Sequence, residues 1–535
     1  LLINNLYIMI VNIENLNFSY HLKQNNILKN ININIDEGKR ILLTGINGAG
    51  KSTLLRIMAG KHLAFNVSTF KIVGFRTPQN GFGGISYIGD DWTKKVNFVG
   101  NVAYSIDMPV KNFMKKVLLF IVDALAARVV EQAMDRGKLP HLDALRQRGV
   151  FRNECISILP SITPAALSSL ATGRYPQDHR IMGAHWYKTQ NDEVEYFGGD
   201  FWVLMNKGVG EFFQEFLGKL NHDLLKADTI FDILEEQGIA TACLNFFIYH
   251  GPKPHEVNVP LMLGLMPGVH YDKEVYGSSI LYLGDFVKTP LADGHILDGS
   301  RNVTNRYGFN DETTFDMLYD PKEHDAFPPF TLAYCPDNDF ESHEKGPHVA
   351  LHTLEAFDER LGNLFELFGG VDAMLDEFAI VIAGDHAQIS MTPGEDKDIK
   401  LDAVLDGIQI VNAGETWDDD DSIIITPNLR KAQIHLKQPT LARRDQVVGK
   451  LLADARVDQV MWRVHDFDES KYGFYIKTAD RGQIHFWADD EGTACDAQGQ
   501  YWRWDGDLSA VDAQVEGDRL IFRDYPNIFE RVACA

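Results

Sequence analysis

From residue 117 onward the chain alternates between short apolar runs and longer stretches of mixed polarity. The clearest apolar runs are Val117–Val122, Phe330–Tyr334 and residues 378–383. Runs of this length are typical of strands in a parallel sheet, because helices cover such strands on both faces. The pattern therefore predicts an α/β fold, with a core sheet that has helices on both faces.

Acidic residues and histidines follow each of these three runs. They are Asp123 after the first run, Asp339 and His343 after the second, and Asp385 and His386 after the third. In α/β proteins the carboxyl ends of the strands carry ligands and catalytic groups. Carboxylate and imidazole together are suitable ligands for a divalent metal ion. Each residue also has a plainer interpretation, as a helix cap or as part of a surface loop.

A helix start is predicted at Thr163, with this residue as the cap and Pro164 at the first helical position. Two interpretations follow from the same geometry. The hydroxyl of Thr163 either serves only as a cap, or lies where the helix N-terminus favours an incoming phosphate. In the second case Thr163 is a candidate nucleophile.

In this order and at these spacings, the residues resemble the type I phosphodiesterase/nucleotide pyrophosphatase family of the alkaline phosphatase superfamily, over about residues 115–535. The resemblance implies an alkaline-phosphatase-like core and hydrolysis of phosphodiester, pyrophosphate or phosphonate bonds. It also implies a threonine nucleophile, Thr163, and two divalent metal ions, expected to be zinc. The implied ligands are Asp123, Thr163, Asp385 and His386 for one ion, and Asp339 and His343 for the other.

The chain departs from the family pattern in two places. An asparagine that often follows the nucleophile by 21 residues is replaced by Ala184. Either the adjacent His185 binds substrate instead, or the choice of substrate differs from that of the family. A late histidine in a glycine-rich stretch is also expected for the second ion. After His386 only His435, His465 and His485 remain, and none has glycine neighbours. We therefore expect the chain to be truncated at its C-terminus, with one metal ion held less well.

A glycine-rich motif, G-x-x-x-x-G-K-S, spans residues 45–52, between an apolar run and a helical stretch. Backbone N–H groups of such a loop wrap a triphosphate, while the lysine and serine contact phosphate and Mg²⁺. The segment resembles the first half of an ABC-type ATPase, which implies ATP and Mg²⁺ as ligands. The implied contact residues are Gly45, Gly48, Gly50, Lys51, Ser52 and Thr53, with Tyr20 stacked on adenine. The sequence holds no L-S-G-G-Q signature, so ATP turnover is not expected.

The net charge of −24 hides a break near residue 113. Residues 1–113 hold 12 Lys and Arg against 6 Asp and Glu, whereas the remainder holds 39 against 69. We interpret this as two joined domains: a partial ABC-type ATP-binding domain over 1–113, and a hydrolase domain over 114–535 with insertions at about 188–330 and 390–520. One protein with an unusual N-terminal domain is the alternative. No basic stripe favours a nucleic-acid polymer, so the expected partner is a small phosphate ester or nucleotide.

The five scattered cysteines form no disulfide or zinc-finger pattern. No run approaches the roughly 18 apolar residues of a membrane span, and no signal peptide is visible, so the chain as written is expected in the cytoplasm. Two other functions stay open: an ABC-type ATP-binding module, and a joined, truncated chain without activity. The sequence does not indicate the oligomeric state.

Overall fold

The computed structural model divides the chain into two units, Leu1–Met114 and Lys115–Ala535. The structure describes residues 9–18, 28–36, 69–72, 115–188, 193–197, 213–258, 272–291, 294–296, 303–323, 326–390, 398–411, 417, 420 and 422–535.

The first unit contains a small antiparallel sheet. Its strands are β1 (Met9–Phe18), β2 (Leu28–Asp36) and β3 (Thr69–Ile72), in the order β2-β1-β3. Strand β1 pairs with both neighbours, and its register with β2 shifts three times. The glycine-rich motif and Tyr20 lie outside the described residues.

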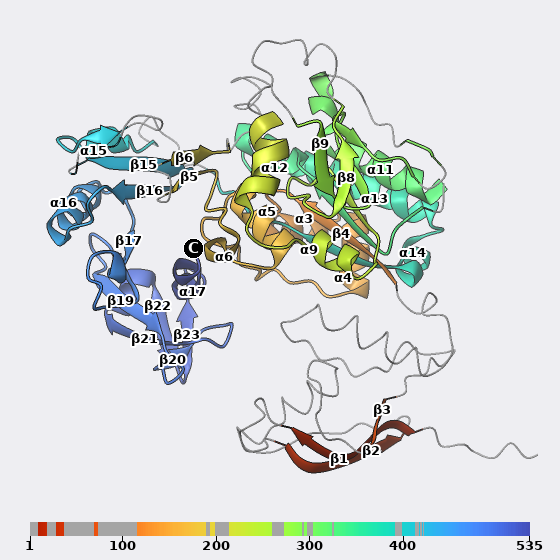
Figure 1. Ribbon diagram of the computed structural model, residues 1–535, viewed down its shortest axis with the longest axis horizontal. Coiled ribbons are helices and arrows are strands. Elements are labelled where there is room, and N and C mark those ends of the chain that lie inside the picture. The colour runs from red at the N-terminus through yellow and green to blue at the C-terminus, as the bar shows by residue number, and fades with distance from the viewer. Residues whose placement is uncertain are drawn as a thin grey trace, which may run out of the picture. The chain divides into compact units, whose positions relative to one another are not determined.

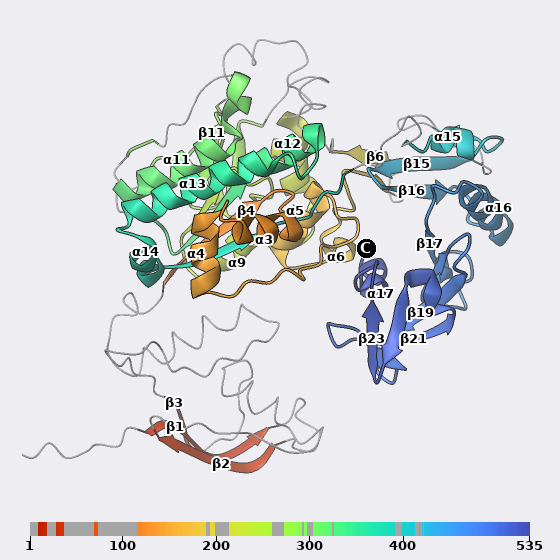
Figure 2. The same ribbon diagram turned by 180° about the vertical axis from the view of Figure 1, so that it is seen from behind.

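The second unit is built on a six-stranded mixed sheet of order β11-β10-β7-β12-β4-β13. Figures 1 and 2 show this unit from opposite sides. Its strands are β4 (Lys116–Val122), β7 (Thr241–Leu244), β10 (Ile280–Leu283), β11 (Val287–Lys288), β12 (Phe330–Cys335) and β13 (Phe378–Ala383). All neighbouring pairs are parallel except β10 and β11. The three predicted strands are therefore neighbours, with β4 between β12 and β13.

Two hydrophobic layers cover this sheet. Along β12, Leu332 and Tyr334 pack into one layer while Ala333 and Cys335 pack into the other, as the two-residue period of a strand requires. The first layer includes α5 (Thr163–Thr172), α9 (Ile230–Glu236) and the π-helix η3 (Phe213–Leu224). The second includes α3 (Ala127–Asp135), α4 (Pro140–Arg148), α11 (Asp311–Glu323), α13 (Leu351–Leu367) and α14 (Val371–Glu377). The predicted α/β fold with helices on both faces is confirmed.

Smaller elements connect or flank these layers. They are α6 (Pro176–His179), α12 (Asp337–Lys345), the 3₁₀ helix η4 (Val303–Gly308), and two hairpins, β5 (His185–Lys188) with β6 (Glu193–Tyr196) and β8 (Lys253–Glu256) with β9 (Glu274–Gly277).

The prediction that residues 378–383 form a buried strand is wrong in part. Strand β13 pairs only with β4 and is the last strand of the sheet among the described residues. Val381 is accordingly 46% exposed. Apolar composition identified the strand, but it does not distinguish a central strand from an edge strand.

The expected insertion at 188–330 also needs correction. Strands β7, β10 and β11 come from this range and belong to the core sheet. Their segments are only two to four residues long, so they left no clear apolar run in the sequence. Only part of this range lies outside the core sheet.

Two further sheets follow the core. The first has the order β14-β15-β16 and consists of β14 (Ile410–Val411), β15 (Ile423–Asn428) and β16 (Lys431–Leu436), with α15 (Leu401–Val404) and α16 (Leu441–Leu452) nearby in sequence. The second has the order β17-β18-β19-β21-β20-β23-β22. Its elements are β17 (Val460–Arg463), η5 (Val464–Asp466), β18 (Phe474–Lys477), β19 (Gln483–Ala488), β20 (Ala494–Cys495), β21 (Tyr501–Gly506), η6 (Leu508–Val511), β22 (Ala513–Glu516), β23 (Arg519–Phe522) and the last helix, α17 (Ile528–Ala533).

The segment that leads to α5 packs against the C-terminal sheet. Leu159 belongs to the same hydrophobic cluster as Phe486 and Phe529. Tyr175 donates a hydrogen bond to Glu530 of α17 at 2.5 Å. The C-terminal region therefore supports the chain on either side of Thr163.

Candidate active site at the carboxyl ends of three strands

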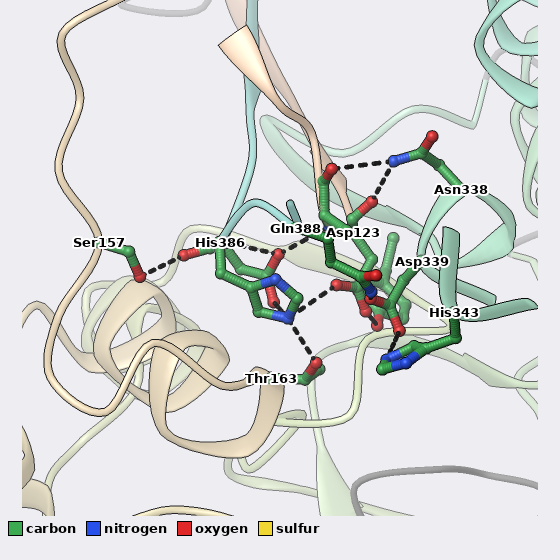
Figure 3. Close-up of polar contacts among 11 residues, drawn as sticks. Asp123, Ser157, Thr163, Asn338, Asp339, His343, His386 and Gln388 are labelled. Atoms are coloured by element: carbon green, nitrogen blue, oxygen red, sulfur yellow. Dashed lines mark hydrogen bonds and ion pairs between the residues drawn. The ribbon is translucent and has the colours of Figure 1, made fainter. Parts of the chain in front are cut away.

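Three neighbouring strands bring their polar residues to one edge of the core sheet (Figure 3). Ligating atoms of Asp123, Asp339 and His386 all lie within 4.8 Å of one another. Asp123 follows β4, Asp339 lies in α12 just after β12, and His386 follows β13. The sequence assigned Asp339 to one ion and the other two residues to a second, whereas the structure gathers all three in one cluster.

Asp123 and Asp385 are buried and repel one another. The pKa of Asp123 is raised well above its ordinary value, first by burial and then by the charge of Asp385. Burial raises the pKa of Asp385 to about 7, and the charge of Asp339 adds to this. One oxygen of each carboxyl, Oδ1 of Asp123 and Oδ2 of Asp385, is buried and accepts no hydrogen bond. The site therefore has a local excess of negative charge that a cation would compensate.

The hydroxyl of Thr163 faces His386 across this cluster. Its Oγ1 lies 2.9 Å from Nε2 of His386. The same Nε2 lies 3.5 Å from Oδ1 of Asp123 and 3.6 Å from Oδ2 of Asp385. His386 thus connects the candidate nucleophile to the two buried carboxyl groups.

Thr163 is the first residue of α5, and the capping position is Ile162, which makes no side-chain cap bond. The predicted role of Thr163 as the cap residue is therefore wrong. Its hydroxyl is directed to His386 rather than to the backbone of its own helix.

Asp339 and His343 lie on a helix, α12, and not in the strand-end loop that the sequence suggested. They are four residues apart, so they occupy the same face, and Nε2 of His343 lies 3.4 Å from Oδ2 of Asp339. Gln388 donates to the other oxygen of Asp339, as Figure 3 shows. The helical spacing positions His343 beside the cluster.

The backbone segments that follow β4 and β13 pack closely against one another around Asp123 and Asp385. Ala124 has φ of +54°, an uncommon conformation for a residue with a side chain, and its N–H donates to Oδ1 of Asp385 at 3.2 Å. A Cβ at Gly384 would approach that of Leu125 to 2.8 Å. Glycine at this position allows the ends of β4 and β13 to approach closely.

Two residues that the sequence analysis did not single out also hold Asp123. The hydroxyl of Tyr334 donates to Oδ2 of Asp123. The side-chain amide of Asn338 donates to the carbonyl groups of Asp123 at 2.9 Å and Ala124 at 3.0 Å. A tyrosine within an otherwise apolar strand was the available signal, because a buried phenol usually requires a hydrogen-bond partner.

His185 lies at the start of β5 and does not belong to the metal-competent group of Asp123, Asp339 and His386. Its backbone N–H donates to Oδ1 of Asn428 at 3.1 Å, and its carbonyl accepts from the amide of Asn428 at 2.6 Å. These bonds anchor its backbone to β15. Its role in substrate binding stays a prediction.

The three late histidines lie elsewhere in the described structure. His435 is in β16 with its ring 5.0 Å from that of Tyr187, and burial lowers its pKa to about 4. His485 is stacked on Tyr475 in the C-terminal sheet, and His465 is in η5. None belongs to the metal-competent group found among the described residues.

Comparison with known proteins identifies the family. Residues 117–486 match the model of the type I phosphodiesterase / nucleotide pyrophosphatase family. The chain belongs to this family. Its members are hydrolases of phosphate esters, and the matched range contains every candidate residue from Asp123 to His386.

Solved structures of similar overall path include murine ectonucleotide pyrophosphatase / phosphodiesterase 5, with a TM-score of 0.40 and 15% identity, covering 66% of this chain and 74% of that one. Phosphonoacetate hydrolase from Sinorhizobium meliloti 1021, in complex with phosphonoformate, has a TM-score of 0.42 and 18% identity. The similarity covers 67% of this chain and 80% of that one.

A second model, the ABC transporter model, matches residues 28–68. ABC transporter I family member 21 of Arabidopsis thaliana is 30% identical over 108 residues, which are 19% of this chain and 38% of that protein. The energy-coupling factor transporter ATP-binding protein EcfA1 of Ligilactobacillus salivarius is 49% identical over 51 residues, 10% of this chain and 18% of that protein. The chain thus spans less than two-fifths of the length of these two curated relatives.

Among the helices that the structure describes, none combines the length and the apolar character that crossing a bilayer requires.

Proposed function

We propose that residues 115–535 hydrolyse a phosphodiester, pyrophosphate or phosphonate bond by displacement on Thr163, assisted by two divalent metal ions. The observation that carries this proposal is the contact of 2.9 Å between Oγ1 of Thr163 and Nε2 of His386, within the group of buried acids. The family match supports the reaction class.

The residues present fit a metal centre. Two buried carboxyl oxygens, on Asp123 and Asp385, accept no hydrogen bond, as expected of atoms that face an ion. Asp123, Asp339 and His386 offer ligand atoms close to one another. We propose Asp123, Thr163, Asp385 and His386 as ligands of one ion, and Asp339 and His343 as ligands of the other. The mixed carboxylate and imidazole donors favour zinc over magnesium.

When bound, such ions would stabilise charge on the phosphoryl oxygens and lower the pKa of the attacking hydroxyl. Thr163 gives its hydroxyl proton to solvent, and its Oγ1 forms a bond to phosphorus while the bond to the leaving group on the opposite side breaks. The leaving group takes up a proton from solvent. The positive end of the α5 dipole favours the negative charge of the phosphoryl group. Water then attacks the phosphorus bonded to Thr163 and breaks its bond to Oγ1. One proton of the water restores the Thr163 hydroxyl, and the released phosphate keeps any substituent that was not the leaving group. His185 is the proposed contact to a small phosphate-ester or nucleotide substrate.

A bis-aryl phosphate, assayed with zinc, tests this proposal. Thr163→Ala is expected to lower turnover by roughly 10³-fold or more, because the nucleophile is removed. Ser161→Ala is the matched control, since Ser161 is an exposed hydroxyl residue two positions earlier. Equal turnover by Thr163→Ala and the unaltered chain would contradict the threonine mechanism. Turnover that persists with a chelator would contradict the metal requirement.

We also propose that the N-terminal segment binds a nucleotide phosphate, on the basis of the ABC transporter match over residues 28–68. Lys51 and Ser52 lie within this range. Binding of ATP with Mg²⁺, measured by calorimetry, should be lost in Lys51→Ala. Identical binding by both proteins would show that the glycine-rich motif is not the site.

A further inference from the structure

Two cationic side chains outside the candidate active site, Lys431 and Arg531, have no carboxylate partner in the described structure. Nζ of Lys431 and Nε of Arg531 are both buried, and neither has a hydrogen-bond partner. Arg531 makes one bond, from Nη2 to the carbonyl of Ile158 at 3.2 Å. Both residues are partly exposed, but these two nitrogen atoms are not. A buried N–H group of a cation without an acceptor is unfavourable, and a bound anion would supply the acceptor.

Lys431 lies on the face of β16 that packs against the core. Residues two apart on a strand share a face, so Lys431, Gln433 and His435 point to the same side. Gln433 donates to the carbonyl of Met182 at 3.4 Å, and the ring of His435 lies 5.0 Å from that of Tyr187. Lys431 therefore lies on the face of β16 that contacts the segment from Met182 to Tyr187, and its Nζ is buried.

Arg531 approaches the same region from α17. Burial lowers the pKa of Lys431 to about 7, and the nearby positive charges of Arg531 and Arg430 add to this shift. The neighbouring acid, Glu530, is already engaged, because it accepts hydrogen bonds from Tyr175 and from Asn527. Nζ of Lys431 and Nε of Arg531 make no hydrogen bond to it.

We propose that Lys431 and Arg531 form a binding site for a small oxyanion, such as phosphate or a carboxylate, between β16 and α17. Ammonium and guanidinium groups donate charge-assisted hydrogen bonds to oxyanions, and their unused N–H groups are available for this. The site uses none of the proposed metal ligands. It adjoins the chain that leads to α5, because Ile158, the partner of Arg531, precedes Thr163 by five residues.

Thermal unfolding of the full chain, treated with a chelator to prevent phosphate binding through metal, tests this site. The midpoint of unfolding in inorganic phosphate is compared with the midpoint in sodium chloride of equal ionic strength. Phosphate should raise the midpoint of the unaltered chain, and Lys431→Met should lose that shift. Arg430→Met is the matched control, because it removes the same charge from the adjacent exposed residue and should retain the shift. Without phosphate, Lys431→Met should unfold at a midpoint no lower than that of the unaltered chain.

Equal phosphate shifts in all three proteins, or no shift in any, would overturn the proposal. If Lys431→Met does not fold, Arg531→Gln provides the same comparison, with the same two outcomes. Sodium acetate as a second probe separates the ligand classes: a shift with acetate indicates a carboxylate site, and a shift with phosphate alone indicates a phosphate site. Because the assay measures no turnover, its failure is distinct from failure of the proposed hydrolase function.

Discussion

The hydroxyl of Thr163 lies 2.9 Å from Nε2 of His386, although 223 positions separate them in the chain. Thr163 begins helix α5, which covers one face of the core sheet, and His386 follows strand β13. Their contact places a hydroxyl at a helix N-terminus beside a group of buried acids. This arrangement places the proposed nucleophile beside the group of residues that could hold a metal ion.

Removing a buried acid should abolish zinc binding while leaving the metal-free chain at least as stable. In Asp123→Asn the repulsion between Asp123 and Asp385 is relieved, so the midpoint of thermal unfolding in chelator should not fall. In the unaltered chain, zinc at 100 times its dissociation constant should add about 2.7 kcal/mol of stability. Metal content and unfolding with and without zinc measure both effects. Full zinc stabilisation of the variant would exclude Asp123 as a ligand.

The contribution of the Asp385 carboxyl group to the stability of the metal-free chain should fall as the pH rises. A carboxyl whose pKa is higher in the folded state stabilises the fold while protonated, and this stability disappears as the pH rises through the folded pKa. For Asp385 the range runs from 3.8 to about 7. The expected loss is at most about 4 kcal/mol between these limits.

Denaturant unfolding in chelator across this pH range measures the loss. Asp385→Asn should flatten the profile, whereas Asp376→Asn, at an exposed position, should not. Parallel profiles for Asp385→Asn and the unaltered chain would show that Asp385 does not ionise in this range.

Tyr334→Phe should weaken metal binding or turnover by about 10- to 100-fold, as removal of a supporting hydrogen bond to a metal ligand typically does. The substitution removes only the hydroxyl that donates to Asp123 and keeps the buried ring. Tyr319→Phe is a suitable control, because its hydroxyl donates to the carbonyl of Arg360 at 3.0 Å, away from the cluster. If both variants keep full zinc affinity and turnover, the Tyr334 contact has no functional role.

Phe529→Ala should destabilise the chain by about 3–5 kcal/mol, because it leaves a cavity in a buried cluster. The ring of Phe529 is stacked on that of Phe486 at 4.0 Å, within the cluster that includes Leu159. Denaturant unfolding measures this loss. Ile521→Ala, at a 36% exposed position, should cost much less. A cost for Phe529→Ala as small as that of an exposed substitution would mean that the packing of α17 contributes little to the fold.

Much of the core could be predicted from the sequence, because strand-forming runs and helix starts depend on neighbouring residues. The apolar run 117–122 indicated β4 and its buried position, and the residues after it indicated where Asp123 would lie. Predictions that required knowledge of strand order were less successful. The run 378–383 did not reveal an edge strand, and the short strands β7 and β10 were missed.

In the candidate site, too, local features could be predicted from the sequence and contacts between distant segments could not. The sequence alone determined which residue types follow the strands, since each of these positions is local to one run. The proximity of Asp339 to Asp123 and His386, the hydrogen bond from Tyr334, and the burial of Nζ of Lys431 depended on the folded chain. They arise from contacts between segments far apart in the sequence, and these contacts are set by strand order and packing, which local patterns do not encode.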